Sequence, residues 1–115
     1  MAKLIYKICP APMWQAAEQA GVFHGAPVDL SDGFIHFSTA DQVRETAAKH
    51  FAGQHDLVLV AVDEAALGSA LKYEASRGGQ LFPHLYASMP CEAVAWVKPL
   101  PLGADGQHEF PVLPE

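Results

Sequence analysis

The chain has 115 residues, of which 50% are hydrophobic and 17% charged, and its formal net charge is −6. This length fits a single domain, residues 1–115, and the low content of charged residues argues against disorder. The acidic balance and the lack of a roughly 20-residue apolar run favour a cytoplasmic protein with neither a nucleic-acid nor a membrane partner.

The N-terminal third predicts a strand, a helix and a loop. Residues 3–9 alternate, with Leu4, Tyr6 and Ile8 on one face and Ile5 and Cys9 on the other, as in a half-buried strand. Pro12 suits the first turn of a following helix, and Gly21 would close that helix. Residues 22–32 contain Gly, Pro, Asp and Ser and therefore predict a loop.

A short strand, residues 33–38, precedes a second predicted helix. Thr39 can cap this helix, with Gln42 three residues later as its partner in a capping box. Val43, Ala47 and Phe51 would form the apolar face, and Gly53 would end the helix.

Strands dominate the second half. Residues 56–63, DLVLVAVD, contain a β-branched run that predicts a strand buried on both faces. Because helices come early and strands late, we expect an α+β domain. The other predicted elements are one helical turn in EAALG, short strands in LKYEA (71–75) and LFPHLYA (81–87) split by an RGG turn, a strand at 92–100, and a tail turn, GADGQ, that could return one further edge strand.

Two polar side chains on the strand at 33–38 are the first candidate site residues. Strand alternation places Phe34, His36 and Ser38 on one face, and an unpaired buried imidazole or hydroxyl costs about 1–3 kcal/mol. Either these groups bond within the protein, with Ser38 helping to cap the helix, or they face a ligand. In the second case the helix N-terminus beside Ser38 would favour a phosphate or carboxylate.

A similar row occurs later, where Phe82, His84 and Tyr86 would share a face if the segment is extended. Such a row could stack a flat ring, or it could simply pack as a half-buried edge. Glu74 would matter as a general base or charge stabiliser only if it met His36 or His84 across a cleft.

We expect no metal site. No His-x-His or His-x-x-x-His pair occurs, and Cys9 and Cys91 lack metal-site spacing. The two cysteines are expected to be reduced, buried thiols.

The segments GFIHFST and FPHLY, together with TAAKHF, DLVLVAVD and LKYE in this order, resemble the bacterial and plant family called domain of unknown function 952. The resemblance covers nearly the whole chain. It implies a fold similar to that of the ADP-ribosyltransferase superfamily: two small, bent, mainly antiparallel sheets and two main helices. In the enzymatic members of that superfamily, a cleft between the sheets holds NAD.

The order of elements is also similar to that in RNA 2′-phosphotransferases. That similarity implies a cleft containing His36 and Ser38, with Tyr6 nearby, and makes Glu74 the candidate carboxylate for stabilising an oxocarbenium-like ribose. Thr39, His84 and Tyr86 complete the expected ligand-binding set. The chain departs from the phosphotransferases in having only two arginines, Arg44 and Arg77, to grip phosphates.

Three functions remain open at this point. The first is a binding module for a small anionic or aromatic metabolite, with NAD or an ADP-ribose-type nucleotide as the candidate ligand or cofactor. The second is an NAD-cleaving or ADP-ribosyl-transferring enzyme that uses Glu74. The third is a structural or oligomerising domain without a ligand. We favour the first because the catalytic pattern is incomplete while polar residues share a face at two sites.

Overall fold

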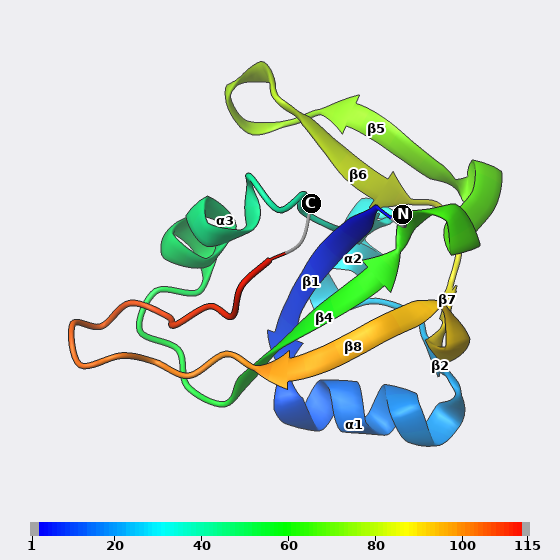
Figure 1. The fold of residues 1–115 in the computed structure, drawn as a ribbon. Coiled ribbons are helices and arrows are strands. Elements are labelled where there is room, and N and C mark those ends of the chain that lie inside the picture. Colours follow the sequence, from blue (N-terminus) through cyan, green and yellow to red (C-terminus); the bar gives the residue numbers. More distant parts are fainter. Residues whose placement is uncertain (1–2, 114–115) are drawn as a thin grey trace.

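The computed structural model describes residues 3–113, apart from the side chain of Arg77 (Figure 1). The helices and strands in chain order are β1 (Leu4–Pro10), α1 (Ala11–Ala20), β2 (Val22–Phe23), α2 (Pro27–Asp32), β3 (Ile35–His36), α3 (Val43–His50), β4 (Leu57–Asp63), β5 (Leu71–Ala75), β6 (Leu81–Leu85), β7 (Met89–Pro90) and β8 (Val94–Pro99). Short 3-10 helices occupy Glu64–Ala70, Arg77–Gly79 and Cys91–Ala93.

The strands form small antiparallel sheets, as the α+β prediction expected. One sheet has the order β1-β4-β8, a second has the order β3-β6-β5, and β2 pairs with β7. The β2–β7 pair is additional to the two sheets that we expected. The helices are few, but α2 joins the two that the sequence predicted.

Strand β4 is the centre of the first sheet and is buried on both faces, as its β-branched run predicted. Val60 and Val62 belong to one core cluster, while Leu59 and Ala61 belong to the other. Strand β1 alternates in the same way, with Ile5 and Cys9 in the first cluster and Tyr6 and Ile8 in the second. The first sheet is therefore the layer between two apolar cores.

Each face of this sheet is covered by one of the two longer helices. Trp14 and Ala17 of α1 pack into the first cluster, and Val43 and Ala47 of α3 pack into the second. Figure 1 shows α1 lying across the β1-β4-β8 sheet and α3 on another side of it. Helix α1 ends as predicted at Gly21, whose left-handed backbone (φ 81°) lets its N–H donate to two helix carbonyls.

The predicted loop at 22–32 was wrong, because this segment contains β2 and α2. Pro27 occupies the first turn of α2, and Asp29, three residues after Ala26, accepts a hydrogen bond from the Ala26 backbone N–H at 2.7 Å. This is the side-chain half of a capping box, which helix N-termini favour. Gly33 then closes α2 in a left-handed conformation.

The predicted strand at 33–38 is shorter than expected, since β3 is only Ile35–His36. The chain changes partner after His36: the N–H of Phe37 still donates to Pro83 of β6, whereas Ser38 exchanges both backbone hydrogen bonds with Tyr6 of β1. This change ends the strict alternation of faces and connects the two three-stranded sheets.

The second helix begins later than predicted, at Val43 rather than directly after Thr39. Thr39 and Gln42 form a turn, in which the Gln42 side chain accepts from the Thr39 N–H at 3.1 Å. Residues of this turn therefore bond to one another, and Ser38 does not adjoin a helix N-terminus. The helix ends at His50, before Gly53.

The remaining elements largely follow the sequence. The predicted strands at 71–75 and 81–87 are β5 and β6, although β6 stops at Leu85. The expected strand at 92–100 is β8, preceded by a 3-10 turn, and the EAALG turn is a longer 3-10 segment. The tail turn is present, but its return is a single bridge, Leu102 to His108, rather than a strand.

Candidate functional site

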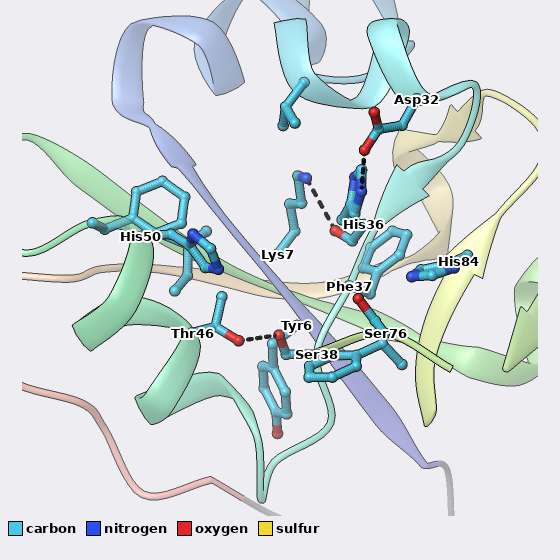
Figure 2. Close-up of a pocket in the computed structure, with 14 residues that line it drawn as sticks. Tyr6, Lys7, Asp32, His36, Phe37, Ser38, Thr46, His50, Ser76 and His84 are labelled. Atoms are coloured by element: carbon cyan, nitrogen blue, oxygen red, sulfur yellow. Dashed lines mark hydrogen bonds and ion pairs between the residues drawn. The ribbon is translucent and has the colours of Figure 1, made fainter. Parts of the chain in front are cut away.

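A pocket of about 500 Å³ lies where β1, β3 and β6 approach α2 and α3 (Figure 2). Its walls combine apolar side chains with hydroxyl and imidazole groups. The lining residues are Tyr6, Lys7, Ile8, Val28, Asp32, His36, Phe37, Ser38, Thr46, His50, Phe51, Ser76, Phe82 and His84. We call this cavity the histidine pocket.

His36 and His84 are brought together by strand pairing. They are direct cross-strand partners in the β3–β6 ladder, and their ring centroids lie 5.5 Å apart with the rings edge to face. Both rings line the histidine pocket. Although far apart in sequence, the two candidate histidines therefore converge.

His36 is held on both ring nitrogens by carboxylates. Its Nδ1 lies 2.6 Å from Asp29, and its Nε2 lies 3.0 Å from Asp32, which is three residues after Asp29 at the end of α2. Both ring nitrogens are therefore occupied by contacts within the protein. Figure 2 shows the Asp32 contact as a dashed line.

Asp29 is the buried anchor behind His36. Its carboxylate is 2% exposed and accepts from the Lys7 ammonium at 2.8 Å, from the His36 ring and from two backbone N–H groups. Burial alone would raise the pKa of Asp29, but the hydrogen bond from His36 and the charge of Lys7 outweigh it and lower the pKa to about 2. For Lys7, burial lowers the pKa and the Asp29 charge opposes this shift.

His84 is 5% exposed and is oriented from behind by Glu74. Its Nδ1 lies 2.9 Å from a Glu74 carboxylate oxygen, and the Tyr86 hydroxyl donates to the same oxygen at 2.6 Å. Hydrogen bonds from Tyr86 and His84 lower the pKa of Glu74, so this carboxylate is ionised and can only accept. Nδ1 of His84 therefore carries the hydrogen. Within residues 3–113, its Nε2 has no hydrogen-bond partner.

Phe34 fixes the plane of the His84 ring. The two rings stack with centroids 4.1 Å apart and an interplanar angle of 27°, and Phe34 also contacts the rings of His36 and Tyr86. Aromatic pairs of this kind add about 0.5–1.5 kcal/mol beyond simple burial. The stack and the Glu74 hydrogen bond together hold His84 in one orientation.

The hydroxyl groups of Ser38 and Thr46 form a second polar region of the wall. Their oxygens are 2.8 Å apart, and the Thr46 hydroxyl donates to the backbone carbonyl of Gln42 at 3.2 Å. Either hydroxyl can donate to the other, and in both cases Ser38 Oγ keeps at least one lone pair. This contact is also drawn in Figure 2.

The predicted site residues divide into two groups. Four of them line the histidine pocket: Tyr6, His36, Ser38 and His84. Thr39 lies in the turn before α3, while Glu74 and Tyr86 lie behind His84. Of the aromatic row on β6, Phe82 lines the pocket, but Tyr86 follows the end of the strand and is 45% exposed.

Sequence reasoning missed the residues that support His36. Lys7 interrupts an otherwise apolar strand, which is a signal for a buried partner of opposite charge. Asp29 follows Pro27 at helix-start spacing, which could have revealed α2 and its carboxylate. His50 and Ser76 also line the pocket, and nothing in their sequence context indicates this.

Two further findings concern only the described residues. Within residues 3–113, no group of three or more His, Cys, Asp or Glu side chains is arranged to hold a metal ion. No helix in this part of the chain is both long and apolar enough to cross a membrane. Cys9 and Cys91 are free thiols, the first buried and the second partly exposed.

The chain belongs to the family described as protein of unknown function, DUF952, whose model matches residues 8–97. The family resemblance expected from GFIHFST and FPHLY is thus confirmed. No curated protein matches the chain.

Solved structures of one relative, protein CC0527 from Caulobacter crescentus, are similar over almost the whole length. Its crystal structure is 52% identical in sequence, covers 92% of this chain and 93% of that one, and superposes with a TM-score of 0.88. Its solution NMR structure is 53% identical, covers 90% of each chain and has a TM-score of 0.82. These structures share the fold described above.

Proposed function

We propose that this protein binds a small molecule in the histidine pocket. The observation that carries the proposal is the buried His84 ring, whose Nδ1 is held by Glu74 while its Nε2 faces no partner within residues 3–113. Nε2 is not among the fully buried atoms that lack a partner in the described residues, so it is open to the pocket, where a donor group of a ligand can bond to it in place of water. The volume, about 500 Å³, lies within the 300–1,000 Å³ typical of ligand sites.

The ligand class to test first is a nucleotide of NAD or ADP-ribose type. The support is the resemblance to ADP-ribosyltransferase folds and the mixture of aromatic and hydroxyl groups around the pocket. In this proposal Phe82 and the two histidines contact a ring, while Ser38 and Tyr6 lie along the same wall. Thr39 and Tyr86, outside the lining, would act only by supporting it.

A second candidate function, cleavage or transfer chemistry on such a ligand, is favoured by the Glu74–His84 pair. A carboxylate that fixes the tautomer of a histidine leaves Nε2 able to accept a proton. Here Glu74 would act through His84, because its own carboxylate already accepts from two side chains and does not line the pocket. Release of nicotinamide from NAD, abolished in Glu74→Gln, would support this function.

The decisive experiment is a thermal-shift titration with NAD, ADP-ribose, nicotinamide and adenosine. A ligand at about 100 times its Kd adds about 2.7 kcal/mol, which is roughly 10 °C for a domain of this size. We expect a shift in the wild type and in His55→Ala, an exposed histidine outside the pocket, but a smaller one in His84→Asn. No shift with any of the four compounds would contradict the proposal and leave the structural or oligomerising function.

A further inference from the structure

The ammonium group of the lysine in the histidine pocket makes all of its contacts within the protein. Lys7 is the one lysine or arginine among the described lining residues. Its ammonium contacts both carboxylate oxygens of Asp29, at 3.0 and 2.8 Å, and the carbonyl oxygen of His36 at 3.0 Å. These three contacts use its three hydrogens, so Lys7 has none left for a ligand.

The ring of His36 is also fully occupied within the protein. Its two nitrogens face the carboxylates of Asp29 and Asp32, so neither nitrogen is available to a ligand. Asp32 is 47% exposed and presents its carboxylate at the pocket wall. An anion entering here would meet a carboxylate rather than an uncompensated cation.

Three backbone N–H groups near Ser38 are also occupied within the protein. The N–H of Ser38 donates to Tyr6, and the N–H groups of Gln42 and Val43 both donate to the carbonyl of Thr39. The N–H groups of Gln42 and Val43, just before and at the start of α3, are therefore not free to bind a phosphate.

Several polar atoms of the lining present acceptors to the pocket. They include Nε2 of His84, a lone pair of Ser38 Oγ and the carboxylate of Asp32. The ring of His50 and the hydroxyl of Ser76, which can donate as well as accept, also line the pocket. Acceptors are satisfied by amino, amide or hydroxyl groups, whereas an ionised phosphate presents only acceptor oxygens.

We propose that the histidine pocket selects unphosphorylated, donor-bearing ring compounds, of the nucleoside or carboxamide class, over their phosphate esters. This inference rests on the proposed small-molecule function and narrows its ligand class. If a dinucleotide binds, its ring and ribose enter the pocket while its phosphates stay outside, in solvent.

Matched ligand pairs that differ by one phosphate test this directly. Calorimetric titrations compare adenosine with AMP, and nicotinamide riboside with nicotinamide mononucleotide, at 50 and 500 mM salt. We expect the unphosphorylated member of a pair to bind at least tenfold more tightly, with less than a twofold change in Kd across this salt range. Tighter binding of the phosphate ester, or a steep loss of affinity with salt, would overturn the inference while leaving the proposed function intact.

Two substitutions of His84 separate its acceptor from its packing. The amide of His84→Asn can keep the contact near Nδ1 to Glu74 but lacks a group at Nε2, whereas His84→Gln places its amide near the Nε2 position. We expect at least a tenfold loss of affinity in His84→Asn and a smaller loss in His84→Gln, with unchanged binding in His55→Ala. Equal binding by all three variants would refute the role of Nε2. Failure of all four compounds to bind the wild type would refute the proposed function itself.

Discussion

Replacing Asp29 by asparagine tests the buried ion pair that supports the histidine pocket. The side chains of Asp29 and Lys7 are 1% and 7% exposed, so Asp29→Asn leaves a buried ammonium without its counter-ion. The amide also presents hydrogens to a position where Lys7, His36 and the backbone all donate. Breaking a buried pair from one side costs about 3–5 kcal/mol, a large part of a typical domain stability of about 5–15 kcal/mol.

The assay is urea and thermal unfolding followed by the fluorescence of the two tryptophans, of which Trp14 is 3% exposed in the first core cluster. At about 4 °C per kcal/mol for this chain length, Asp29→Asn should lower Tm by roughly 12–20 °C. Asp41→Asn, an exposed carboxylate in the turn before α3, is the matched control and should change stability by less than about 0.5 kcal/mol.

The double variant Lys7→Met/Asp29→Asn separates charge from shape. Removing the orphaned ammonium should recover part of the lost stability, giving a positive coupling between the two sites. A loss below about 1 kcal/mol in Asp29→Asn, or simple additivity in the double variant, would refute the idea that this pair holds α2 against β1.

Three further predictions concern stability and reactivity. The pKa of Asp29 falls from its ordinary 3.8 to about 2, so the stability that its carboxylate contributes above pH 3.8 should be lost as the pH falls through 2. In urea unfolding, the free energy of unfolding should fall by about 2 kcal/mol more between pH 6 and pH 2 in the wild type than in Asp29→Asn. Gly25→Ala places a Cβ 2.8 Å from Asp29 Cβ at a φ of +121°, so in thermal unfolding it should lose about 1–3 kcal/mol, more than Gly106→Ala, which has open space. Burial raises the pKa of Cys9 to about 11, so a thiol reagent should modify the partly exposed Cys91 first and Cys9 only on unfolding; equal rates would contradict the burial of Cys9.

The parts of the fold that could be predicted are those with a strong local pattern. The β-branched run of β4 and the proline and glycine at the ends of α1 act within a few residues, so the sequence carries their signals directly. Helix α2 was missed because its Gly, Pro, Asp and Ser composition is equally typical of a loop. Pro27 and Asp29 do have helix-start spacing, but the contact that joins Asp29 to Lys7 of β1 is set by the fold and not by a local pattern.

The candidate site could be predicted only as separate residues. His36, Ser38 and His84 stood out because polar groups on buried strands need partners. Which partners they have depends on strand pairing: His36 opposes His84, and Glu74 reaches His84 from the neighbouring strand. The distinction between His36, occupied on both nitrogens, and His84, occupied on one, follows from tertiary contacts and is invisible in the sequence.

The two backbone hydrogen bonds between Tyr6 and Ser38 form the junction between the two three-stranded sheets, and hydrogen exchange can measure how often this junction opens. Their N–H groups donate across it at 2.8 and 2.9 Å, and both side chains line the histidine pocket. A local opening of this junction would expose both amide hydrogens to exchange with deuterium at the same time. The amides of Ile5 and Lys7, in register with β4, would stay protected. The exchange rate of the Tyr6 and Ser38 amides, compared with that of the Ile5 and Lys7 amides, thus reports how often the two sheets separate. A bound molecule that slows this separation should slow the exchange of Tyr6 and Ser38.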